Sequence, residues 1–134
     1  MNGFRFLLLP LVFFLIGCAT ISGKSRLEKF TGIAKSFEIA LRRSDFSTAA
    51  KFIDPSAPHH EVEPSDLKNI RIVDYEVKNI KVAEDKLEVL QDTELKYYHL
   101  DHNILNTIQY RQEWRYKTED KVWLLQTGLP ELTQ

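Results

Sequence analysis

The chain has 134 residues, with 18 basic and 19 acidic side chains and a formal net charge of −1. This balance argues against a nucleic-acid-binding protein, which needs a basic stripe or patch. The length fits a single domain that can bury a core of its own. Because the sequence holds only one cysteine, an intramolecular disulfide is excluded.

The first 17 residues have the pattern of a secretion signal. A positive charge at Arg5 precedes an almost wholly apolar run over residues 6–16. A membrane-spanning helix needs about 20 apolar residues, so this run is too short to span, and Pro10 inside it disfavours a continuous helix. We therefore expect residues 1–17 to be a signal peptide that is removed on export.

The apolar run ends in Leu15-Ile16-Gly17-Cys18, which resembles the lipobox of bacterial lipoprotein precursors. The resemblance implies that the thiol of Cys18 is linked to diacylglycerol. Cys18 then becomes the new N-terminus and is N-acylated, so that palmitate-like chains anchor the protein in a membrane. The alternative is an ordinary signal peptide with an incidental cysteine.

The residue after the cysteine is Ala19, not the aspartate that resembles an inner-membrane retention signal in enteric bacteria. In a Gram-negative host we expect the outer membrane, with the domain facing the periplasm. In a Gram-positive host the same signal would hold the domain outside the cytoplasmic membrane.

Two helices are expected after a short polar tether, which with Cys18 occupies residues 18–25. Ser25 and Glu28 have the spacing of a capping box, and apolar residues follow at helical spacing. Ser44-Asp45 then breaks this helix and caps a second, shorter one, which Asp54-Pro55 ends. The apolar positions of the first helix are Phe30, Ile33, Ala34, Phe37, Ala40 and Leu41.

The rest of the chain alternates with the period of antiparallel strands that have one wet and one covered face. We expect strand structure over residues 70–82, 87–97, 104–117 and 122–126, with turns between them. In the first of these segments the apolar phase slips, which indicates either a kinked strand with a β-bulge or two closely joined strands. Residues 26–134 thus predict one α+β domain, an N-terminal helix pair packed on a curved antiparallel sheet of about four strands.

This arrangement resembles the cone-shaped fold of the nuclear transport factor two-like superfamily, which includes ketosteroid isomerases and SnoaL-type cyclases. The resemblance covers residues 27–126 and lies in two segments, Phe37 to Ala49 and Glu113-Trp114 to Leu125. The helical segment is also similar to a tetratricopeptide helix pair, an alternative that the strands argue against. No catalytic residue of the superfamily transfers to a position in this chain.

In a cone fold, a pocket lies between the sheet and the helices, so the strand positions that face the helices are candidate pocket residues. Strand alternation puts no Asp, Glu, His, Lys or Arg among them. The polar or aromatic candidates could orient an uncharged ligand, or they could simply bond to one another inside the protein. They are Gln91, Thr93, Asn106, Tyr110, Gln112 and Trp114.

Other sites find little support in the sequence. His99, Asp101 and His102 are close in one loop and His59-His60 lie in another, but solvated loop residues are the simpler interpretation and we expect no metal. No glycine occurs between Ile33 and Thr127, which excludes a glycine-rich phosphate loop in that range. We expect no cofactor.

Two classes of function remain. The first is a membrane-anchored, non-catalytic module that binds an envelope protein or a small uncharged ligand. The second is an enzyme of the SnoaL-like or ketosteroid isomerase-like type with an unrecognised site, which would need a titratable group inside the cone. A one-residue slip of register would exchange the two faces of a strand and turn Glu94 and Glu113 inward.

Overall fold

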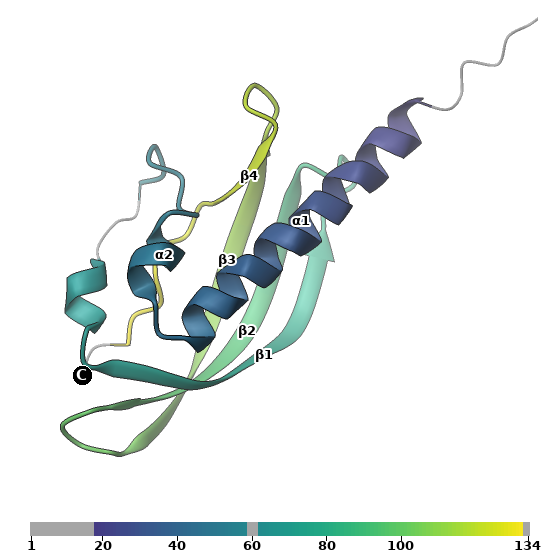
Figure 1. Cartoon of the computed structure of the whole chain (residues 1–134). Helices are drawn as coiled ribbons and strands as arrows, with labels where there is room; N and C mark the ends of the chain where they lie inside the picture. The colour runs from purple at the N-terminus through teal and green to yellow at the C-terminus, as the bar shows by residue number, and fades with distance from the viewer. Residues whose placement is uncertain (1–17, 59–61, 133–134) are drawn as a thin grey trace, which may run out of the picture.

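The computed structural model describes residues 18–58 and 62–132. It has a long helix α1 (Cys18–Arg42), a short helix α2 (Phe46–Ala50) and a 3-10 helix η1 (Pro64–Leu67). Four strands follow, β1 (Ile70–Val82), β2 (Glu88–His99), β3 (Leu105–Lys117) and β4 (Val122–Leu125). They form one antiparallel sheet in the order β1-β2-β3-β4, so the expected α+β class and strand number are confirmed. Figure 1 shows α1 running along one face of the sheet.

Helix α1 begins earlier than the sequence indicated. Residues 18–25, expected to be the lipidated cysteine and a short polar tether, are part of the helix, and Ser25 lies inside it with an exposed side chain. The capping-box prediction at Ser25 is therefore wrong. Packing explains the early start, because Gly23 is buried and Arg26 reaches back to the carbonyl oxygen of Asp85 at 3.2 Å, in the turn between β1 and β2.

The turn between the two helices follows the sequence prediction. Asp45 caps α2 by accepting hydrogen bonds from the backbone amide and the hydroxyl of Thr48, at 3.1 and 2.7 Å. Ser44 adopts a φ of 54°, a conformation that usually favours glycine. Its hydroxyl accepts a hydrogen bond from the amide of Ile72 at 2.9 Å, so a serine here also ties the turn to β1.

The phase slip in the first strand segment is real. Strand β1 is one continuous strand, and its register against β2 shifts twice, between Ile72 and Asp74 and between Val77 and Asn79. Each shift inserts one residue and returns the next apolar side chains to the side of the buried β2 residues, although Val77, Ile80 and Val82 remain exposed there. The kinked-strand interpretation is thus confirmed over the two-strand alternative.

The core joins helix phenylalanines to sheet tryptophans. Phe30 meets the rings of Trp114 and Trp123 edge-on at centroid distances of 5.9 and 5.2 Å, and Phe37 meets Trp114 at 5.4 Å. Phe37 and Leu41, two of the apolar positions predicted for the first helix, are 0% exposed, and both tryptophans are 1% exposed.

The C-terminal segment, for which the sequence predicted no structure, completes this core. After β4 the chain crosses back toward η1 and the start of β1 (Figure 1), and it buries Leu129 and Leu132. Tyr110 donates a hydrogen bond to the carbonyl oxygen of Gly128 at 2.7 Å, which holds the segment against β3. No helix within residues 18–58 and 62–132 combines the length and apolar character needed to cross a membrane.

We predict that Phe37→Ala lowers the free energy of unfolding by about 3–5 kcal/mol, because it removes a ring from a packed cluster. Ile39→Ala, on the exposed side of the same helix, is the matched control and should change stability far less. Urea unfolding followed by tryptophan fluorescence measures both variants. Equal losses would contradict the assigned buried face of α1.

Candidate functional site

A cluster of polar side chains lies on the helix-facing side of the sheet. Gln91 and Gln112 occupy paired positions on β2 and β3, and Tyr75 of β1 reaches both. Gln112 donates to the hydroxyl of Tyr75 at 2.8 Å, and Gln91 donates to the same hydroxyl at 3.2 Å. Trp114 donates its indole N–H to the amide oxygen of Gln112 at 3.0 Å. We call these four residues the amide cluster.

The amide cluster uses its hydrogen-bonding groups internally. Gln91 is 3% exposed and Gln112 is 0% exposed, and a weak contact of 3.4 Å links their amides. Nearby, the hydroxyl of Thr93 donates to the carbonyl oxygen of Tyr110 at 2.7 Å. These bonds agree with the alternative in which the polar residues form hydrogen bonds within the protein rather than with a ligand.

The two phenols of this region stay protonated near neutral pH. Burial is the main cause that raises the pKa of Tyr75 to about 12, against smaller opposing effects of the two glutamine hydrogen bonds. Burial also raises the pKa of Tyr110 well above the ordinary range. Neither phenol is suited to give up a proton near pH 7.

In the described part of the chain, three separate hollows each include one of the six candidate pocket residues. Tyr110 lines a hollow of about 370 Å³ between β3 and the C-terminal segment. Asn106 lines a smaller one of about 160 Å³ near the loop between β2 and β3. Trp114 contributes to a third of about 390 Å³ beside residues 81–83, at the end of β1. Gln91, Thr93 and Gln112 line none of these three.

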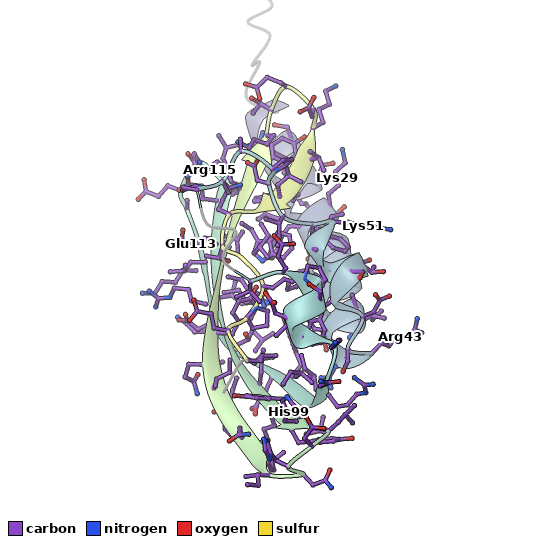
Figure 2. All side chains as sticks on the ribbon, turned by 90° about the vertical axis from the view of Figure 1, so that its left-hand side faces the viewer. Lys29, Arg43, Lys51, His99, Glu113 and Arg115 are labelled. Carbon is purple, nitrogen blue, oxygen red and sulfur yellow. The ribbon has the colours of Figure 1, made fainter. Side chains whose placement is uncertain are left out.

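The side chains of Glu94 and Glu113 decide the register question raised by the sequence. Glu94 accepts a hydrogen bond at 3.0 Å from exposed Gln109 on β3, and Glu113 is exposed and points away from the helices (Figure 2). Along each strand these glutamates alternate with the buried positions, so they lie on the other face of the sheet. The two carboxylates therefore do not meet in an enclosed pocket, and the assignment of strand faces is confirmed by burial.

One buried charge was missed by the sequence reading. Asp54, interpreted only as the end of the second helix, is 3% exposed. Its carboxylate accepts bonds from the amide and hydroxyl of Ser56, from Gln126 at 3.1 Å and from Lys117 at 2.9 Å. Its backbone amide also bonds to Leu125 of β4 at 2.8 Å. Nothing local in the sequence marks this role, because Lys117 and Gln126 are more than 60 positions away in the chain.

Asp54 is a structural anion rather than a candidate base. The hydrogen bonds from Ser56, and next the bond from Lys117, hold the pKa of the Asp54 carboxyl well below its usual range despite burial. Four donor groups occupy the carboxylate. It therefore ties the chain after α2 to the ends of β3 and β4.

The histidine loop offers no assembled metal site. The Nδ1 atom of His99 accepts a hydrogen bond from the amide of Asp101 at 3.2 Å, and the His99 and His102 rings lie 5.2 Å apart. Across the described ranges, no group of three or more His, Cys, Asp or Glu side chains could hold a metal ion. His59 and His60 lie outside the described residues.

We predict that Gln112→Leu destabilises the domain by about 1–3 kcal/mol for each buried polar group left without its partner. The Trp114 indole loses its acceptor, whereas the Tyr75 hydroxyl loses one of its two donors and keeps the bond from Gln91. The matched control is Gln109→Leu on the same strand, which loses one exposed bond. If chemical denaturation finds the two variants equally stable, the amide cluster is not a structural network.

Asp54 should make folding sensitive to acid. Its pKa in the folded chain lies below the ordinary 3.8, so its stabilising contribution is complete above the unfolded pKa. The contribution is lost as the pH falls below that value toward the folded pKa. We predict that Asp54→Asn lowers stability at neutral pH and weakens the loss of stability on acidification, measured by urea unfolding across pH. Asp120→Asn, in the exposed turn before β4, should leave the pH profile unchanged.

No family model, no curated protein and no solved structure matches this chain. Its function must therefore be inferred from the chemistry of its own residues.

Proposed function

We propose that the chain is a lipid-anchored protein of the cell envelope whose domain binds a partner and catalyses no reaction. In this proposal Cys18 carries the lipid, and the helices and sheet form a small version of the cone-like arrangement. The partner is an envelope protein that docks on the surface. A small uncharged ligand inside the cone is the less favoured form of the same proposal.

The proposal rests on one observation: the buried polar side chains on the helix-facing side of the sheet already form hydrogen bonds with one another. The interior amides of Gln91 and Gln112 bond to Tyr75, and Trp114 bonds to Gln112. A ligand that entered here would have to replace these bonds, and leaving buried polar groups unpaired is costly. We therefore place the binding surface outside the core.

The filling of the interior supports the same inference. Leu129 and Leu132 of the C-terminal segment are buried in the main core cluster, where an open cone would keep free space. Trp114 occupies the middle of the sheet under two phenylalanines. Both features favour a solid domain that recognises its partner through exposed groups.

An enzyme of the SnoaL-like or ketosteroid isomerase-like type is the second candidate, and it needs an inward carboxylate or histidine that is free to move protons. The buried carboxylate of Asp54 is fully engaged with Ser56, Gln126 and Lys117. Glu94 and Glu113 face away from the helices. None of these three carboxylates is both inside the domain and free to transfer a proton, which favours the binding module over the enzyme.

The proposed location follows from the lipobox-like sequence before Cys18. Lipidation would anchor the start of α1, since that helix begins at Cys18. In a Gram-negative host Ala19 favours the outer membrane with the domain in the periplasm. The anchor fits a binding role because it raises the local concentration of the domain near envelope partners.

We predict that Cys18→Ser abolishes labelling by an alkyne fatty acid and leaves an uncleaved precursor, because the thiol is the group that accepts lipid. Intact-mass measurement of the wild-type protein should show loss of residues 1–17 and added acyl mass. Ser25→Ala, which leaves the lipobox unchanged, is the control and should be processed normally.

Native mass spectrometry of the same preparation tests the binding mode. The purified wild-type protein should carry its acyl chains and no other small molecule. Normal processing of Cys18→Ser would contradict the anchor, and a retained small ligand would contradict the surface-binding proposal.

A further inference from the structure

The charges of the chain are divided between its two layers. Residues 18–51, which hold α1 and α2, contain seven basic and three acidic side chains, whereas residues 52–134 contain ten basic and sixteen acidic ones. A chain with little net charge therefore has a basic helical layer and an acidic remainder. This division creates an electrostatic field between the two layers, which the net charge of the whole chain does not reveal.

We call five of the exposed basic side chains of the helical layer the basic face, and the exposed acidic ones of this layer are Glu28 and Asp45. This face is defined by Lys24, Lys29, Lys35, Arg43 and Lys51, all of which are exposed. Figure 2 shows that Lys29, Arg43 and Lys51 project on the helix side of the molecule, whereas Glu113 and Arg115 project on the opposite side. From Lys24 to Arg43 the face extends along about 28 Å of chain at the helical rise.

Most of these basic groups lack an acidic partner in the part of the chain that the structure describes. Only Lys35 is paired, with Glu38 at 3.3 Å. On the outer side of the sheet, by contrast, Arg111 is paired with Asp92 at 2.8 Å and Arg115 with Glu88 at 3.1 Å. Asp45 lies close enough to Arg43 and Lys51 to interact with them electrostatically, but within residues 18–51 the basic side chains still outnumber the acidic ones by seven to three.

An apolar hollow lies beside the basic face. It has a volume of about 410 Å³ between α1 and β4, with Ile33, Val122 and Trp123 in its lining together with Lys29 and Lys121. Two ammonium groups next to apolar side chains match an amphiphile with an anionic head. The apolar lining and Lys121 add to the charge count, which already includes Lys29, and point to the same chemistry.

We propose that the basic face rests on the surface of an anionic phospholipid membrane, with the hollow beside Trp123 receiving part of a phospholipid. The inference deepens the proposed function and rests on the anchor at Cys18 for its geometry. Because α1 starts at Cys18, no flexible tether separates the lipid from the helix. The anchor and the basic face then act together as two membrane signals.

The contact would set the orientation of the whole domain. With α1 lying along the membrane, the outer side of the sheet faces away from it and toward soluble partners. That side carries the Asp92–Arg111 and Glu88–Arg115 pairs. It also borders the hollow of about 390 Å³ lined by Lys81, Leu90 and Glu113. The membrane contact thereby selects which surface remains free for recognition.

The test uses two cysteine reporters in the full-length, processed protein. Gly32→Cys places a thiol on the basic side of α1, where a side chain meets nothing within 4 Å. Thr107→Cys places one on the exposed outer side of β3. Each protein is bound to vesicles of phosphatidylcholine alone or of phosphatidylcholine with phosphatidylglycerol. The rate of reaction with a membrane-impermeant maleimide is then measured.

We expect the anionic vesicles to slow labelling of Gly32→Cys and to leave Thr107→Cys unchanged, with high salt removing the difference. Adding Lys24→Gln and Lys29→Gln should restore fast labelling, since each basic group contributes about a fivefold preference for an anionic surface. The matched control adds Lys81→Gln and Lys96→Gln, which remove the same charge from the sheet side. This control should keep the protection.

Equal labelling of Gly32→Cys on both kinds of vesicle would overturn the proposal, and so would protection that survives loss of Lys24 and Lys29. Protection without vesicles would overturn it too, because it would assign the face to a protein contact. Absence of lipid on Cys18 is detected by a separate measurement. In that case the protein without an added cysteine reacts with maleimide at Cys18 and takes up no fatty acid.

Discussion

The packing of Trp114 against α1 is the contact on which the rest of the structure depends. Two phenylalanines of the helix, Phe30 and Phe37, meet this indole edge-on, while its N–H is fixed by Gln112. One side chain thus joins the helical layer to the sheet and the apolar core to the buried polar groups. Because the indole is rigid and needs one hydrogen bond when buried, its position also fixes where the amide cluster lies.

This packing has a consequence for function. A sheet whose helix-facing side is filled by tryptophans and internally bonded amides has little room for chemistry at its centre. Asp54, the one buried carboxylate in the described residues, is neutralised by Lys117 and ties the chain after α2 to the sheet. Both observations favour a binding site on an outer surface over one in the interior. The two candidate surfaces are the basic helical layer and the side of the sheet that carries the ion pairs.

The sequence by itself determined a large part of this picture. Helical spacing identified Phe37 and Leu41 as core residues, and strand alternation assigned the faces of β2 and β3 correctly, because these patterns follow from the geometry of a single element. The same reasoning found the irregularity in β1, where the slip between Ile72 and Tyr75 needs an inserted residue. It also gave Gln91 and Gln112 as inward polar groups.

Only the tertiary structure decided how distant segments meet. The extension of α1 back to Cys18 was not predicted, and the contact of its first half with the turn after β1, through Arg26 and Asp85, joins residues far apart in the chain. The burial of Leu132 and the pairing of Asp54 with Lys117 depend on groups far apart in the chain. The sequence could name the interior amides, but their hydrogen-bond partners follow from strand register, which no single segment contains. The folded structure therefore decided that these amides bond to one another.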